Sequence, residues 1–91
     1  MNVTWDLDKE KENIRKHNIS FSYAAEVFHD DHRLVCYDVI HSSEEDRYIH
    51  IGKTDDEVVV FVVETESNED EIRIITARKA NKRERKAYDY G

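Results

Sequence analysis

The sequence predicts an α+β domain in which two N-terminal helices precede a four-stranded antiparallel sheet and a short C-terminal helix. Three observations predict this order. Apolar residues recur at helical spacing in residues 21–28, strand-like apolar runs fill residues 33–77, and the connections between those runs are short and charged. A chain of 91 residues has room for one modest core, so we expect residues 1–91 to form a single domain.

The first helix is predicted over residues 7–16. Asp6 can cap its N-terminus, acidic residues follow in the first turn, and basic residues occupy the last turn, an order that complements the helix dipole. Asn18 suits the left-handed position that ends such a helix, because Asn commonly replaces Gly there. The apolar face of this helix is thin, so we expect most of its surface to contact water.

The second helix is predicted to begin after Ser20, which can cap it. Its apolar residues fall at positions i, i+3, i+4 and i+7, which places them on one face. They are Phe21, Ala24, Ala25 and Phe28. This continuous stripe predicts that the second helix is buried more deeply than the first.

Four strands and a final helix account for most of the remaining chain. The strands are expected at residues 33–40, 47–52, 58–63 and 72–77. The third run is apolar throughout and therefore predicts a central strand covered on both faces. Asn81, three residues before Glu84, resembles a capping box that starts a helix ending near Tyr88.

Positive charge is concentrated in residues 73–88. This segment holds seven Lys or Arg against one acid, for a net charge of +6, whereas the whole chain carries −7. A basic strand and helix in an acidic protein favour contact with phosphate-rich partners at one surface. The candidate RNA-binding residues are Arg73, Lys82, Arg83, Arg85 and Lys86.

The composition gives no sign of a membrane segment or a disulfide. The apolar run at residues 58–63 is far shorter than the ~20 residues that cross a bilayer, and the first residues lack an apolar signal core. Cys36 is the single cysteine, which agrees with a reducing compartment. We therefore expect a cytoplasmic protein. We also assign no cofactor.

Short motifs spread over nearly the whole chain occur in the order typical of one protein family. They are Trp5-Asp6 with Lys9, Asn13, Lys16-His17, Ser20-Phe21, Ala24, Phe28, Arg47, Gly52, the run from Ile72 to Ala80, Glu84-Arg85 and Tyr88. No single motif is strong, but the ordered set is specific. It resembles the BrnT family, the toxin component of BrnT/BrnA type II toxin–antitoxin systems.

This resemblance implies a small RelE-like fold, RNA cleavage without a metal, and inhibition by a ribbon-helix-helix (BrnA-like) antitoxin. The family's toxin–antitoxin complex binds operator DNA through the antitoxin. Three positions depart from the pattern, because Asn18 stands where the family usually has Gly, Tyr23 where it often has Glu, and Ser67 where it typically has an arginine. The third departure matters most, because that arginine is a candidate active-site cation. The alternative function is therefore a binding module with weakened catalysis that acts as a co-repressor with its antitoxin.

RNA cleavage without a metal needs a group for the proton of the 2′-hydroxyl and positive charge beside the phosphate. Arginine suits the second role because its fork of donors matches two phosphate oxygens. The candidate catalytic residues are Arg78, Lys79, Arg47 and His17. Arg73 and Arg78 lie five positions apart, so they can serve one site only if their strand twists or bulges.

Other histidines carry weaker signals. His29 and His32, with Asp30 and Asp31, could bind a metal, and a metal-dependent hydrolase is a third possibility. That spacing is common in loops, and nothing else in the sequence completes a site, so we assign no metal. His41 and His50 carry no separable signal.

Overall fold

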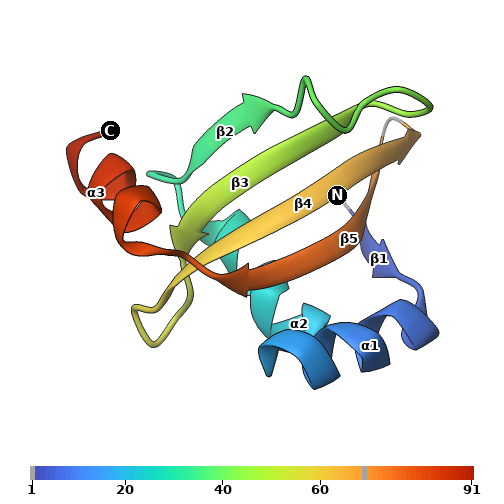
Figure 1. The fold of residues 1–91 in the computed structure, drawn as a ribbon, viewed down its shortest axis with the longest axis horizontal. Helices are drawn as coiled ribbons and strands as arrows, with labels where there is room; N and C mark the ends of the chain where they lie inside the picture. Colours follow the sequence, from blue (N-terminus) through green and yellow to red (C-terminus); the bar gives the residue numbers. More distant parts are fainter. Residues whose placement is uncertain (1, 69) are drawn as a thin grey trace.

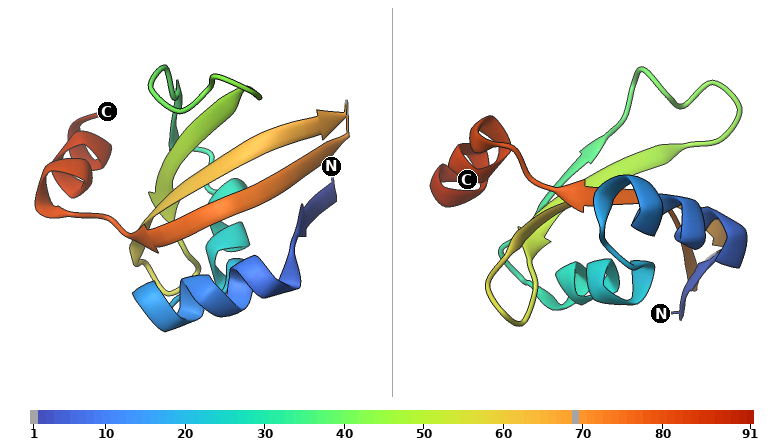
Figure 2. Two further views of the ribbon diagram at one scale, coloured as in Figure 1. Left: turned by 45° about the vertical axis from the view of Figure 1, so that its right-hand side comes forward. Right: turned by 60° about the horizontal axis from the view of Figure 1, so that its bottom comes forward.

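The computed structural model describes residues 2–68 and 70–91, and these form one mixed sheet with helices on both sides (Figure 1). The elements in chain order are β1 (Asn2–Trp5), α1 (Leu7–His17), α2 (Phe21–Ala24), the 3-10 helix η1 (Ala25–His29), β2 (Leu34–Tyr37), β3 (Arg47–Lys53), β4 (Val59–Asn68), β5 (Glu71–Lys79) and α3 (Lys82–Tyr90). Figure 2 shows α1 and α2 along one face of the sheet and α3 beyond the end of β5. None of the helices in the described residues is long and apolar enough to cross a membrane.

The sheet differs from the expected four antiparallel strands. Its order over the described residues is β1-β5-β4-β3-β2. The pairs β2 with β3, β3 with β4 and β4 with β5 are antiparallel, and β1 pairs with β5 in parallel. The expectation of a wholly antiparallel sheet was wrong because β1 is four residues long and pairs Val3 with Ile72. A short strand whose partner is far along the chain leaves no local pattern to detect.

The helix boundaries follow the capping residues. The Asp6 carboxylate accepts hydrogen bonds from the backbone amides of Asp8 and Lys9, and Asn18 ends α1 in the left-handed conformation with φ 58°. Asn81 and Glu84 form the capping box of α3. These assignments confirm the expected starts of the first and last helices. The second helix is shorter than expected, because regular α-helix ends at Ala24 and η1 continues it.

Two apolar clusters lie on opposite faces of the sheet. The larger cluster lies under α1, α2 and η1 and contains Ile19, Phe21, Ala24, Val27, Phe28, Val60, Val62, Ile72, Ile74 and Ala77. The smaller cluster lies on the other face, which we call the open face, and contains Ile51, Val59 and Ala80 with Leu34, Ile49, Phe61 and Tyr88 packed against it. Residues of β4 contribute to both clusters, which confirms a central strand covered on both sides.

Asn13 joins α1 to the outer edge of β5. Its amide nitrogen donates to the carbonyls of Ile19 and Ala77, both at 2.9 Å, and its oxygen accepts from the Ala77 amide and the Thr76 hydroxyl, both at 3.1 Å. β1 pairs with β5 only as far as Ile74. The Asn13 side chain therefore takes the place of a neighbouring strand where β1 has ended.

A hydrogen bond between two distant side chains holds α3 against the sheet. The Tyr88 hydroxyl donates to Asp30 Oδ2 at 2.5 Å, and the same oxygen accepts from the Lys53 amide at 2.8 Å. Burial, followed by the hydrogen bond to Asp30, raises the pKa of Tyr88 to about 12. Tyr88 therefore has a structural role in the docking of α3.

Replacing Asn13 with Ala is expected to lower the free energy of unfolding by about 3 kcal/mol, because buried backbone groups of Ile19 and Ala77 lose their partners. Urea unfolding followed by circular dichroism measures the change. Lys11→Ala, at an exposed position of the same helix, is the control and should leave the midpoint unchanged. A loss below about 1 kcal/mol for Asn13→Ala would show that water replaces the amide without cost.

Replacing Tyr88 with Phe is expected to destabilise the protein by about 1.5 kcal/mol near neutral pH, the usual contribution of a hydrogen bond to a charged group. The folded-state pKa of about 12 lies above the ordinary value of 10.0, so the neutral phenol is favoured by folding. This contribution is complete below pH 10 and is lost as the pH rises toward 12. The stability difference between wild type and variant should therefore shrink over that range.

Tyr90→Phe is the matched control, because Tyr90 lies in the same helix and is 89% exposed. Denaturant titrations of the three proteins across the alkaline range make the comparison. An unchanging gap between wild type and Tyr88→Phe would contradict the assigned role of the hydroxyl.

Candidate active site

A bulge in β5 places two arginines on the same face of the sheet. Val63 of β4 pairs with Thr76 and Glu64 pairs with Ile74, so Ile75 is an extra residue without a direct partner. Before and after the bulge, Ile74 and Ala77 both face the larger cluster. Arg73, Thr76 and Arg78 therefore lie on the open face. A regular strand would have separated Arg73 from Arg78.

Arg47 of β3 also lies on the open face. It pairs across the sheet with Thr65, which in turn pairs with Arg73. Nearer the C-terminal end of β5, Arg78 pairs with Phe61, and Phe61 pairs with Ile51 of the smaller cluster. The open face thus presents three arginines around an apolar patch.

Arg47 and Arg78 line one pocket of about 420 Å³, which we call the arginine pocket. Apolar side chains and a threonine lie between the two arginines, and the loop after β2 closes one side. The lining residues are Asp38, Ile40, His41, Arg47, Ile49, Phe61, Val63, Thr76 and Arg78. Cations beside an apolar patch could bind a phosphate together with the attached base or sugar.

The guanidinium of Arg78 is held in place on two sides. Its central carbon lies 4.0 Å from the centre of the Phe61 ring, and its two terminal nitrogens donate to Glu84 at 2.7 and 2.9 Å. Hydrogen bonds from Arg78 hold the pKa of Glu84 below its usual value, although burial opposes that shift. Arg78 is consequently oriented before any ligand arrives, and Glu84 balances part of its charge.

Arg47 and Arg73 share a single carboxylate. A terminal nitrogen of Arg73 lies 3.2 Å from Glu45, and a terminal nitrogen of Arg47 lies 3.7 Å from the same group. The Nε atoms of both arginines are buried without a hydrogen-bond partner in the described structure. Glu45 is 38% exposed and can move away, which would leave both guanidinium groups able to bind an anion.

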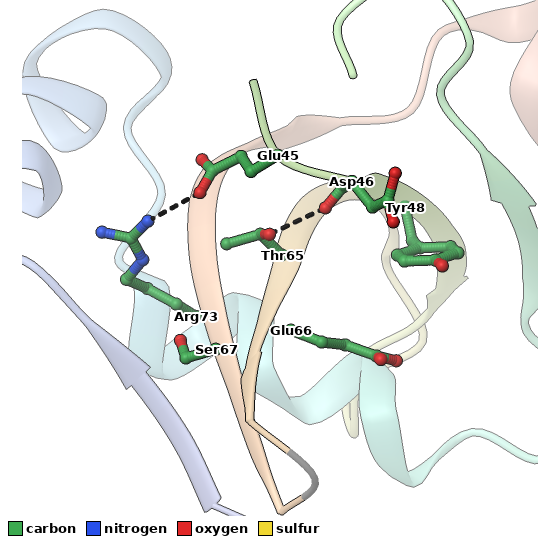
Figure 3. A pocket seen from close by; sticks show the side chains of 7 residues that line it. All are labelled: Glu45, Asp46, Tyr48, Thr65, Glu66, Ser67 and Arg73. Carbon is green, nitrogen blue, oxygen red and sulfur yellow. Dashed lines mark hydrogen bonds and ion pairs between the residues drawn. The ribbon is translucent and has the colours of Figure 1, made fainter. Parts of the chain in front are cut away.

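Arg73 lines a second pocket that is mostly acidic (Figure 3). Figure 3 shows Arg73 paired with Glu45, and the Thr65 hydroxyl donating to the Asp46 carbonyl at 2.7 Å. The lining residues are Glu45, Asp46, Tyr48, Thr65, Glu66, Ser67 and Arg73. Three carboxylates beside one arginine would repel a phosphate, so this pocket is a weaker candidate than the arginine pocket.

The arginine pocket also contains a histidine, His41, which carries no separable signal in the sequence. His41 Nδ1 lies 3.0 and 3.2 Å from the two carboxylate oxygens of Asp38, and both residues line the pocket. The one signal in the sequence is an acid three residues before a histidine at the end of a predicted strand. That spacing is too common in loops to identify a pair without the structure.

The remaining candidates from the sequence lie elsewhere. Lys79 pairs with Val60 and faces the helix-covered side, where it lines a pocket with Ile14 and Tyr23. His17 is the exposed last residue of α1 and is not among the residues that line the arginine pocket. The α3 candidates Lys82, Arg83, Arg85 and Lys86 are all exposed.

The acidic and histidine residues before β2 are arranged as a turn. Asp30 accepts hydrogen bonds from the backbone amides of His32 and Lys53 as well as from Tyr88. Within residues 2–68 and 70–91, no group of three or more His, Cys, Asp or Glu side chains is placed to hold a metal ion. Through these hydrogen bonds, Asp30 joins the turn to β3 and α3.

Comparisons with known proteins agree with the family resemblance. A family model described as the ribonuclease toxin BrnT of type II toxin–antitoxin systems matches residues 5–84. The crystal structure of the Brucella abortus ribonuclease toxin BrnT matches with a TM-score of 0.69 and 21% sequence identity, over 90% of this chain and 99% of that chain. A search of curated proteins found no match.

The structural match and the family match support different conclusions. The structural match, at 21% identity, shows a shared fold and says nothing of individual site residues. The family model extends from Trp5 in β1 to Glu84 in α3, and so includes every strand after β1 and both arginines of the pocket. This chain therefore belongs to the BrnT family of ribonuclease toxins of type II toxin–antitoxin systems.

Proposed function

We propose that this protein is a metal-independent endoribonuclease in which Arg47 and Arg78 bind the scissile phosphate. The observation that carries the proposal is that these arginines, from β3 and the end of β5, line the same pocket. The family supplies the reaction class, because its members are described as ribonuclease toxins. Lys79 and His17 lie outside this pocket, so the proposal rests on the two arginines.

The chemistry requires positive charge where negative charge develops. When a 2′-hydroxyl attacks phosphorus, the non-bridging oxygens gain charge, and preorganised arginine forks stabilise that state more than the ground state. Arg78 is already oriented by Phe61 and Glu84. Arg47 would release Glu45 and turn toward the phosphate, because its ion pair of 3.7 Å is loose.

The rest of the RNA would follow the remaining cations. Lys82, Arg83, Arg85 and Lys86 are exposed on α3, and Arg73 lies on the open face beyond Arg47. Charges farther away than a Debye length of about 8 Å are screened, so the chain's net charge of −7 does not prevent local binding. The distant acids would make binding weak and sensitive to salt.

We also propose that the antitoxin is a ribbon-helix-helix protein of the BrnA type, that it inhibits by covering the arginine pocket in the cytoplasm, and that it carries the complex to operator DNA. An acidic side chain of the antitoxin could pair with Arg47 and Arg78 as Glu45 and Glu84 do now.

If the antitoxin covers the arginine pocket, adding the purified antitoxin should stop cleavage and protect Arg47 and Arg78 from a guanidinium-specific reagent. Inhibition with both arginines still reactive would place the antitoxin elsewhere.

The purified chain, freed of any partner, is expected to cleave a mixed RNA substrate in excess EDTA. Arg78→Ala and Arg47→Ala should each lower the rate about 100-fold, the usual loss when one donor to a developing charge is removed. Arg15→Ala is the control, because Arg15 is exposed on α1 away from the open face. Gel electrophoresis of time courses measures the rates.

Two outcomes would contradict this proposal. Activity that disappears in EDTA and returns with a divalent metal would mean that the protein uses a metal. Intact RNA with folded wild-type protein would mean that this chain does not cleave under these conditions, which favours the alternative function.

The alternative function is a binding module with weakened catalysis that acts as a co-repressor with its antitoxin. One observation favours it, because Ser67, which replaces the family's arginine, lines the pocket beside Arg73 (Figure 3). With a serine at position 67, Arg73 is the one cation among the described residues that line this pocket, and it faces three acidic side chains there. RNA binding at that end of the open face would be weakened.

Under this alternative, Ser67→Arg is expected to increase RNA cleavage by about tenfold or more, since one added hydrogen bond to a charged phosphate contributes roughly 1.5–3 kcal/mol. Ser22→Arg, an exposed position of α2, is the control for added charge. Growth arrest after induction and cleavage rates in vitro are the two measurements. Equal activity for wild type and Ser67→Arg would exclude Ser67 as the cause of weak catalysis.

A further inference from the structure

We propose that His41 is the general base of the ribonuclease reaction and that Asp38 positions it. This inference rests on the proposed function, because it concerns the same pocket and the same substrate class. His41 lies with Arg47 and Arg78 in the lining of the arginine pocket. It belongs to the loop between β2 and β3, separate from the strands that carry the arginines.

The contact with Asp38 determines which nitrogen of His41 is available. The Asp38 carboxylate can only accept, so the Nδ1 atom that lies 3.0 Å from it carries the hydrogen. The Nε2 atom then keeps its lone pair. Asp38 has a side chain only 10% exposed, whereas the side chain of His41 is 64% exposed. A buried acid thus orients an imidazole whose basic nitrogen remains accessible to substrate.

The loop that carries His41 is tied directly to Arg47. The Asp38 amide donates to the Arg47 carbonyl at 2.8 Å, and the Arg47 amide donates to the Ser42 hydroxyl at 3.0 Å. The Ser42 hydroxyl in turn donates to the Asp38 carbonyl. These bonds fix the backbone positions of the proposed base and a phosphate-binding arginine relative to each other, which is the arrangement that proton transfer during attack requires.

Other residues of the pocket are poorly suited to accept the proton. Arg47 and Arg78 carry guanidinium groups, which have five donors and no acceptor for a proton. Asp38 is mostly buried and directs its oxygens at His41, and Glu84, beside the pocket, is engaged by Arg78 with a lowered pKa. Among the residues described as lining the pocket, His41 is the group with an exposed side chain and a ring nitrogen, Nε2, that is free of the Asp38 contact and can accept a proton.

The reaction balances without any further reagent. His41 Nε2 removes the proton of the 2′-hydroxyl, the 2′-oxygen forms a bond to phosphorus, and the bond from phosphorus to the 5′-oxygen breaks. The leaving 5′-oxygen takes a proton from water, and the imidazolium returns its proton to solvent. The products carry a 2′,3′-cyclic phosphate and a 5′-hydroxyl, and Arg47 and Arg78 neutralise the charge that develops on the phosphorane oxygens.

The test compares cleavage with binding in the full chain. His41→Ala should lower the single-turnover cleavage rate about 100-fold or more, the usual contribution of a general base. Binding of a 2′-O-methyl RNA of the same sequence, which cannot be cleaved this way, should stay within about twofold, because the arginines hold the phosphate. Added imidazole should restore part of the rate. Glu44→Ala, an exposed change in the same loop, is the control and should behave as wild type.

Asp38→Asn tests the positioning role. It should lower kcat with KM unchanged, and it should cause no further loss when combined with His41→Ala, because Asp38 acts through that residue. Melting curves confirm that each variant is folded. A loss in the double variant that equals the product of the two single losses would show that Asp38 acts independently of His41.

The outcomes separate this inference from the proposed function. Normal cleavage by His41→Ala, together with loss of cleavage in Arg78→Ala, overturns the inference and leaves the proposed function standing. Loss of 2′-O-methyl RNA binding in His41→Ala, or failure of imidazole to restore activity, also overturns it, because His41 would then serve binding or folding. Wild-type protein that neither binds nor cleaves RNA overturns both.

Discussion

The arrangement of the candidate site depends on the hydrogen bonds between Asn13 and the backbone of Ala77. β1 accompanies β5 only to Ile74, and the outer edge of β5 would otherwise present unpaired backbone groups to a buried environment. The Asn13 amide supplies a donor and an acceptor there, as a neighbouring strand would. Directly before this contact, β5 contains the bulge that brings Arg73 and Arg78 to the same face.

The two faces of the sheet carry different kinds of residues. Its helix-covered face carries most of the buried apolar residues, whereas its open face carries the arginines and only the smaller cluster under α3. This division allows the open face to carry cations without placing them in the main core. Each arginine of the open face is held by an internal carboxylate, Glu84 for Arg78 and Glu45 for the other two.

These internal carboxylates suggest how the site can remain ordered without substrate. A bidentate pair such as Arg78 with Glu84 fixes the guanidinium plane, and the Phe61 ring beneath it limits rotation. Glu45 is more exposed and its contacts are longer, so an incoming phosphate competes with it more easily. The three arginines therefore differ in how much reorganisation RNA binding would require, with Arg78 needing the least.

The sequence by itself determined the local features of this protein. Asp6, Asn18, Asn81 and Glu84 act within a few residues of themselves, so the helix ends could be predicted, as could the central position of β4 from its continuous apolar run. The ordered motifs also identified the family that the comparison confirmed.

Only the tertiary structure decided the features that join distant parts of the chain. The pairing of β1 with β5, the bulge at Ile75 and the position of His41 beside Arg47 and Arg78 all arise from contacts across the sheet. Such contacts depend on which distant segments meet, and the periodicity of one segment shows which of its residues are buried without showing which segment it contacts.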